Sequence, residues 1–177
     1  MCIRDRSLRL SEVDTAALRF LIESLNDDGY LEESLEELAI SLAGPDDVEQ
    51  IEELVHRFTV AQRLLQSLEP VGVGARNLSE CLTLQLTALA ADEDSDADPE
   101  TVQTALRICQ QPLEMLARRD IRRLTQLCSE GGVAGEERIR SAMALIARLE
   151  PRPGRRFADV ERNIITVSYT HLRAHET

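Results

Sequence analysis

The stretch that most constrains the fold is residues 68–86, LEPVGVGARNLSECLTLQL, because it contains a helix stop, a glycine-rich turn and a helix start. Glu69-Pro70 ends the apolar-periodic segment before it, since proline lacks a backbone N–H and disfavours α geometry in its predecessor. Gly72 and Gly74 then provide two positions at which a positive φ costs little. The stretch therefore predicts two helices joined by a turn of defined geometry.

The second of these helices has a recognisable start. Asn77 is a predicted N-cap, and Glu80 follows three residues later, as in a capping box. Similar start and stop signals recur along the chain, and residues 48–68 predict one long helix with a continuous apolar face. Aromatic residues make up 3% of the chain and tryptophan is absent, so the core must be built from aliphatic side chains, which favours helices.

These patterns predict an all-α fold with irregular packing of about eight helices in two helical subdomains. The acidic segment 92–98 is low in apolar residues and predicts an exposed loop. We therefore expect a first subdomain at residues 7–91 and a second at residues 99–166. Leu149-Glu150-Pro151 repeats the earlier Leu-Glu-Pro punctuation after another long helix.

The two ends of the chain do not fit the rest. The start MCIRDR and the end VSYTHLRAHET can be encoded so that the first five codons of each are reverse complements, as in translated sequencing-library adapter DNA. We therefore expect residues 1–6 and 167–177 to be non-native and the remainder to be an internal piece of a longer protein. His171 and His175, which lie at a zinc-ligand spacing, are accordingly not interpreted as a metal site.

Residue types that carry chemistry are scattered. Cys81, Cys109 and Cys128 are widely spaced without a C-x-x-C motif, which favours buried small hydrophobes over ligands or nucleophiles. The sequence around Gly72 and Gly74 lacks a preceding strand and the Gly-Lys-Ser/Thr of a phosphate loop, so a structural turn is favoured there. We therefore predict no catalytic residue, no metal ligand, no cofactor and no small-molecule substrate.

The formal net charge of −12 argues against a nucleic-acid grip and fits either solubility or a basic protein partner. Arg118, Arg119, Arg122 and Arg123 form a basic cluster at helical spacing, which is either a solvated face or a contact to an acidic protein patch or a nucleic-acid backbone. No apolar run is long enough to span a bilayer and no signal-peptide pattern opens the chain, so we expect a cytoplasmic protein without membrane contact.

Four segments in order, LNDDGYL, LQSLEPVGVGARNLSECLTLQL, LARRD and LIARLEPRPGRRF, together resemble the core-binding region of bacterial sigma-54 transcription factors. The resemblance covers residues 8–166 and implies a non-enzymatic, all-helical pair of subdomains that binds core RNA polymerase. Factors of this family direct DNA-directed RNA polymerase to promoters with elements near −24 and −12, and transcription initiation awaits an enhancer-bound AAA+ ATPase. The resemblance implies that contacts to promoter DNA and to this activator belong to parts of the parent protein outside this chain.

The resemblance does not say which residues contact polymerase. We expect a contact group at the turn and the following helix, and a second group in the basic cluster: Arg76, Asn77 and Glu80, then Arg118, Arg119 and Arg122. A further set is expected to be architectural: Pro70, Gly72, Gly74, Pro151 and Gly154. The alternative function is a helical protein–protein adaptor or anti-sigma-like scaffold whose acidic face binds another basic protein.

Overall fold

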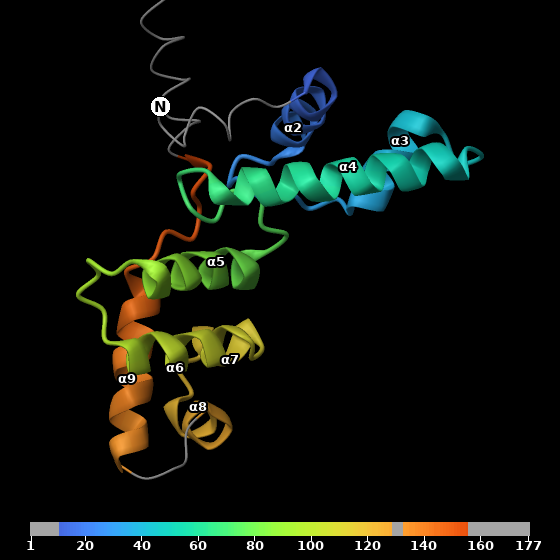
Figure 1. The fold of residues 1–177 in the computed structure, drawn as a ribbon. Helices are drawn as coiled ribbons and strands as arrows, with labels where there is room; N and C mark the ends of the chain where they lie inside the picture. Colours follow the sequence, from blue (N-terminus) through green and yellow to red (C-terminus); the bar gives the residue numbers. More distant parts are fainter. Residues whose placement is uncertain (1–10, 129–132, 156–177) are drawn as a thin grey trace, which may run out of the picture. The chain divides into compact units, whose positions relative to one another are not determined.

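The structure is a computed structural model of the 177-residue chain, and it describes residues 11–128 and 133–155. Within these residues it contains eight α-helices and no strand, which confirms the all-α class (Figure 1). The terminal segments 1–6 and 167–177 that we interpret as non-native lie outside the described residues. The helices are α2 (Glu12–Ser24), α3 (Leu35–Ala43), α4 (Val48–Ser67), α5 (Leu78–Ala91), α6 (Pro99–Cys109), α7 (Leu113–Ala117), α8 (Ile121–Cys128) and α9 (Val133–Ala147).

Several helices begin at the capping residues that their sequences predict. At α3 the Ser34 hydroxyl accepts a hydrogen bond from the Glu37 amide at 3.2 Å, and the Glu37 carboxylate accepts one from the Ser34 amide at 2.9 Å. The hydrogen bonds from the Ser34 backbone and side chain lower the pKa of Glu37. These contacts satisfy amides that the first helical turn leaves without intrahelical partners.

The chain folds into two compact units. Of the described residues, one unit contains 11–65 and 152–155, and the other contains 66–128 and 133–151. We call them the first and second units. This division differs from the boundary that we expected at residues 92–98, because α5 belongs to the second unit rather than to the subdomain before the acidic loop. The reason is packing: Leu82 and Leu86 of α5 share one buried core with residues of α6, α8 and α9.

The core of the second unit is almost entirely aliphatic, as the low aromatic content requires. It also contains two cysteines that behave as small apolar side chains. Burial of aliphatic surface on this scale is the main force that holds the four helices together. The buried members are Leu82, Leu86, Val102, Ala105, Ile108, Cys109, Leu124, Cys128, Ile139, Ala142 and Ile146.

The first unit contains a stacked pair of aromatic side chains. Phe58 of α4 is fully buried, and its ring stacks on Phe20 of α2 with centroids 5.4 Å apart and planes inclined by 13°. Leu21 and Leu31 are also fully buried. The apolar face of α4 is covered only in part, because Val48 at its first turn remains exposed.

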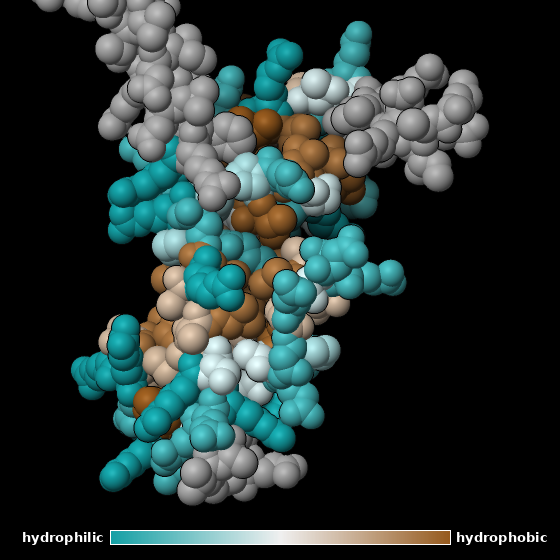
Figure 2. Space-filling view, turned by 90° about the vertical axis from the view of Figure 1, so that its left-hand side faces the viewer, coloured by the Kyte–Doolittle hydropathy of each residue, from teal (hydrophilic) through white to brown (hydrophobic). Residues whose placement is uncertain are grey.

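Large apolar side chains also remain at the surface, and Figure 2 shows hydrophobic residues among hydrophilic ones on one face of the molecule. In the described parts of the chain, no helix combines the length and the hydrophobicity that crossing a bilayer requires. The exposed large apolar residues are Val13, Ile22, Ile40, Leu42, Val48, Val60, Leu68 and Leu127.

Candidate functional site

The turn between α4 and α5 is held by its own backbone. Gly72 and Gly74 have φ angles of 104° and 84°, a region that favours glycine, and the Glu69-Pro70 peptide bond is cis. The Ala75 amide donates to the Gly72 carbonyl at 3.3 Å, and the turn residues 72–75 are buried. A buried turn of this kind offers no open cradle of amides to a phosphate, so its glycines serve its geometry.

Space as well as φ requires glycine at position 72. A Cβ atom there would lie 2.7 Å from the Cys81 sulfur and 3.1 Å from the Gln85 side-chain nitrogen. The turn is also tied to the end of α4, because the Gln66 side-chain amide donates to the Gly74 carbonyl at 3.2 Å. The turn therefore packs directly against α5.

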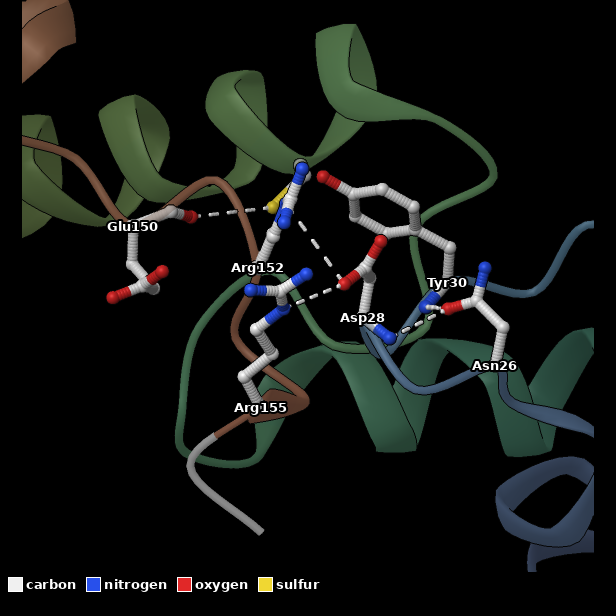
Figure 3. Close-up of polar contacts among 7 residues, drawn as sticks. Asn26, Asp28, Tyr30, Glu150, Arg152 and Arg155 are labelled. Atoms are coloured by element: carbon white, nitrogen blue, oxygen red, sulfur yellow. Dashed lines mark hydrogen bonds and ion pairs between the residues drawn. The ribbon is translucent and has the colours of Figure 1, made fainter. Parts of the chain in front are cut away.

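Gln85 of α5 lies beside this turn and hydrogen-bonds the segment that follows α9. Its amide nitrogen donates to the Glu150 carbonyl at 2.6 Å, and its amide oxygen accepts from the Glu150 backbone N–H at 2.9 Å. The Cys81 sulfur lies 3.8 Å from the same carbonyl, a contact that Figure 3 shows. We call this arrangement the second-unit junction; it joins the second Leu-Glu-Pro segment, residues 149–151, to α5.

A comparable contact closes the first unit. The Gly154 amide donates to the Asp28 carbonyl at 2.9 Å, and a Cβ atom on Gly154 would lie 2.6 Å from the Asp28 carbonyl carbon. The loop that receives it is shaped by Asn26, whose side-chain oxygen accepts from the amides of Asp28 at 3.0 Å and Tyr30 at 2.9 Å (Figure 3). We call this arrangement the first-unit junction.

Charge reinforces the first-unit junction. The Asp28 carboxylate lies 3.2 Å from the Arg155 guanidinium and 3.9 Å from that of Arg152, and Figure 3 shows both arginines directed at it. Partly exposed ion pairs of this kind contribute only about 0.2–1 kcal/mol each. Close backbone packing at Gly154 therefore matters more here than the charges do.

The first predicted contact group lies together at the start of α5. The Asn77 side-chain oxygen accepts from the Glu80 amide at 2.9 Å, and the Glu80 carboxylate accepts from the Arg76 amide at 2.7 Å. Asn77 and Glu80 thus cap the helix. The Arg76 side chain is exposed, and none of the ion pairs in the described part of the chain involves it.

The second predicted contact group lies on a different element, the turn between α7 and α8. Arg118, Arg119 and Arg122 are all exposed there. Arg119 has a φ of 51°, which is uncommon for a residue other than glycine. The structure therefore places the six predicted contact residues in two groups.

Burial lowers the reactivity of two cysteine thiols. Burial raises the pKa of the Cys109 thiol to about 11. It also raises the pKa of Cys128, against the opposing effect of the Arg107 charge. These thiols therefore stay protonated near neutral pH and are poor nucleophiles. Across residues 11–128 and 133–155, no cluster of three or more His, Cys, Asp or Glu side chains is placed to hold a metal ion.

Comparison with known proteins places this architecture in a family. Residues 5–169 match the family model described as "Sigma-54 factor, core binding domain". The chain therefore belongs to the sigma-54 factor family, over its core binding domain.

Proteins named RNA polymerase sigma-54 factor in several bacteria are similar to this chain. The chain is 37% identical over 159 residues to that of Pseudomonas aeruginosa (strain UCBPP-PA14), an alignment covering 88% of this chain and 28% of the relative. It is 40% identical over 134 residues to that of Acidithiobacillus ferridurans, covering 76% and 24%. It is 35% identical over 158 residues to that of Xanthomonas euvesicatoria, covering 89% and 30%. The chain thus spans less than a third of the length of these relatives.

The junction contacts of Gln85, Asp28 and Arg155 were missed by the sequence analysis. Gln85 and Glu150 are 65 residues apart, and Asp28 and Arg155 are 127 apart, so no local pattern pairs them. The one available signal was the recurrence of Leu-Glu-Pro, which marks residues 149–151 as a second helix stop without showing that α5 contacts it.

Replacing Gly154 by alanine should destabilise the chain by about 1–3 kcal/mol, because the new Cβ would overlap the backbone of Asp28 and Gly29. Gly44→Ala is the control for an added methyl group in open space, since nothing lies within 4 Å of it; the φ of 85° at Gly44 adds a backbone strain that Gly154 does not have. Urea unfolding of both variants measures the difference. A cost below about 1 kcal/mol for Gly154→Ala would contradict the close packing at the first-unit junction.

Replacing Gln85 by alanine should lower the free energy of unfolding by about 1–3 kcal/mol, because it leaves both backbone groups of Glu150 without this partner. Gln103→Ala provides the control, as that glutamine is exposed on α6 and its loss should change stability by less than about 0.5 kcal/mol. Thermal unfolding compares the two. Equal effects would contradict the role of the amide pairing.

Two substitutions at Asn77 should show whether its contribution to stability comes from helix capping. Asn77→Ala should cost about 0.5–2 kcal/mol, because the Glu80 amide loses its acceptor, whereas Asn77→Ser should retain most of the stability. Urea unfolding reports both. A serine variant as unstable as the alanine variant would show that the cap is not what Asn77 contributes.

Proposed function

We propose that this chain is the part of a bacterial sigma-54-type transcription initiation factor that binds core RNA polymerase, and that it acts in the bacterial cytoplasm. The observation that carries the proposal is the match to the core binding domain over residues 5–169. The helical structure supports it, because segments that carry the resemblance form both junctions and so shape both units.

The remaining activities are proposed for the parent protein. It would direct polymerase to promoters with −24 and −12 elements and respond to an enhancer-bound AAA+ ATPase. This chain spans less than a third of its relatives, so we assign promoter recognition and activator contact to other parts of the parent. In this proposal the chain has a binding role and uses no cofactor, and catalysis belongs to the polymerase.

We propose that the contacts to polymerase come from the start of α5 and from the α7–α8 turn. Arg76 is exposed beside Asn77 and Glu80, whose hydrogen bonds hold the helix start in one conformation. Such preorganisation reduces the ordering cost of binding. The architectural residues Pro70, Gly72 and Gly74 would act by presenting this helix start, and Pro151 and Gly154 by shaping the segment after α9.

The adaptor or anti-sigma-like alternative gains no support from the comparisons, since the similar proteins are named as sigma factors. Recovering the native gene beyond residue 166 discriminates between the two. A helix-turn-helix followed by a basic terminal box indicates the sigma factor, and their absence favours the adaptor.

The 177-residue chain should be retained by immobilised core RNA polymerase, more weakly than a full-length sigma-54 factor and in competition with it. It should not shift a duplex carrying −24 and −12 elements in a gel assay, because the promoter-reading parts are assigned elsewhere. Pull-down with excess full-length factor is the specificity control. Failure to bind polymerase, or clean sequence-specific binding to the duplex, would contradict the proposal.

A further inference from the structure

We infer that the α7–α8 turn is a basic docking surface that holds an acidic segment of core RNA polymerase, an inference that rests on the function proposed above. The surface consists of Arg118, Arg119, Arg122 and Arg123, here called the arginine cluster. All four residues are exposed, two before α8 and two in its first turn. Arg123 is added here to the second contact group that we expected from the sequence, namely Arg118, Arg119 and Arg122.

The arginine cluster reverses the charge of the molecule locally. The whole chain has a formal net charge of −12, yet none of the ion pairs found among the described residues involves the cluster. The carboxylate nearest in sequence, Asp120, is already engaged, because it accepts a hydrogen bond from the Arg123 backbone amide at 3.2 Å. The four guanidinium groups therefore remain available to an external anion.

The placement of these charges is unfavourable for the fold itself. Arg122 and Arg123 put positive charge at the positive end of the α8 dipole, and the carboxylate that offsets it there is that of Asp120, which caps the helix. Arg119 adopts a φ of 51° although glycine would occupy that region at less cost. This conformation closes the end of α7, because the Arg119 amide donates to the Leu116 carbonyl and the Asp120 amide donates to the Met115 carbonyl, each at 3.2 Å. The fold therefore uses the backbone of Arg119, while its side chain stays exposed.

The charges favour a protein partner over a nucleic acid. A nucleic-acid grip needs a basic stripe that follows the backbone, whereas the field of this acidic chain would repel an extended polyanion. A compact group of guanidinium forks suits a few carboxylates, each of which can accept two parallel hydrogen bonds. An acidic protein segment is therefore the partner that the cluster fits.

The test uses the full chain and measures its affinity for core RNA polymerase at low and moderate salt. The variant R118Q/R119Q/R122Q/R123Q should bind at least about fivefold more weakly and with a flatter salt dependence, since several ion pairs are lost together. The control R19Q/R63Q/R140Q/R148Q removes four exposed arginines elsewhere and should stay within about twofold of the unmodified chain. The variant R118K/R119K/R122K/R123K retains the charge and should retain most of the binding.

Thermal unfolding separates loss of binding from loss of fold. The glutamine variant of the cluster should melt at the same temperature as the unmodified chain or higher, because it removes positive charge from the start of α8. Unchanged affinity in this variant would overturn the inference while leaving the proposed function in place. Equal losses in the cluster and control variants would also overturn it.

Binding of the arginine cluster to nucleic acid is the alternative outcome of this test. Binding of non-specific duplex DNA that depends on the cluster, with polymerase affinity unaffected, would reassign the surface and overturn the inference. If the unmodified chain fails to bind polymerase at all, the proposed function fails first and this inference fails with it.

Discussion

The second unit depends on one side-chain amide that pairs with both backbone groups of a distant residue. Gln85 hydrogen-bonds the amide and the carbonyl of Glu150, and Gly72 packs beside Gln85 and against the Cys81 sulfur, which would lie only 2.7 Å from an added Cβ. This arrangement fixes the turn before α5 relative to the segment after α9. The helix start at Asn77, where we propose a polymerase contact, follows directly from that turn.

Much of the fold could be predicted because its signals are local. Ser34 and Asn77 cap the helices that their sequences indicate, since a cap is a contact over three residues, and Asp98 caps α6 in the same way. Hydrogen bonds from the Thr101 side chain and backbone hold the pKa of Asp98 below its ordinary value, so this cap remains charged at neutral pH. The all-α class follows from such signals together with the aliphatic composition.

The grouping of helices could not be predicted in the same way. The acidic loop 92–98 has the composition of a boundary, but Leu82 and Leu86 place α5 in a core with helices that follow the loop. Likewise, nothing local pairs Asp28 with Arg155, although each lies in a segment that carries the family resemblance. Packing between distant segments is decided by three-dimensional complementarity that one sequence does not display.

The central claim is that this chain meets polymerase through the start of α5 and the α7–α8 turn. Hydrogen–deuterium exchange of the chain, with and without core RNA polymerase, tests it most directly because every backbone amide in the contact reports. The account predicts slower exchange in the bound state at residues 76–80 and 118–123. Unchanged exchange in both segments, with protection elsewhere in the chain, would contradict it.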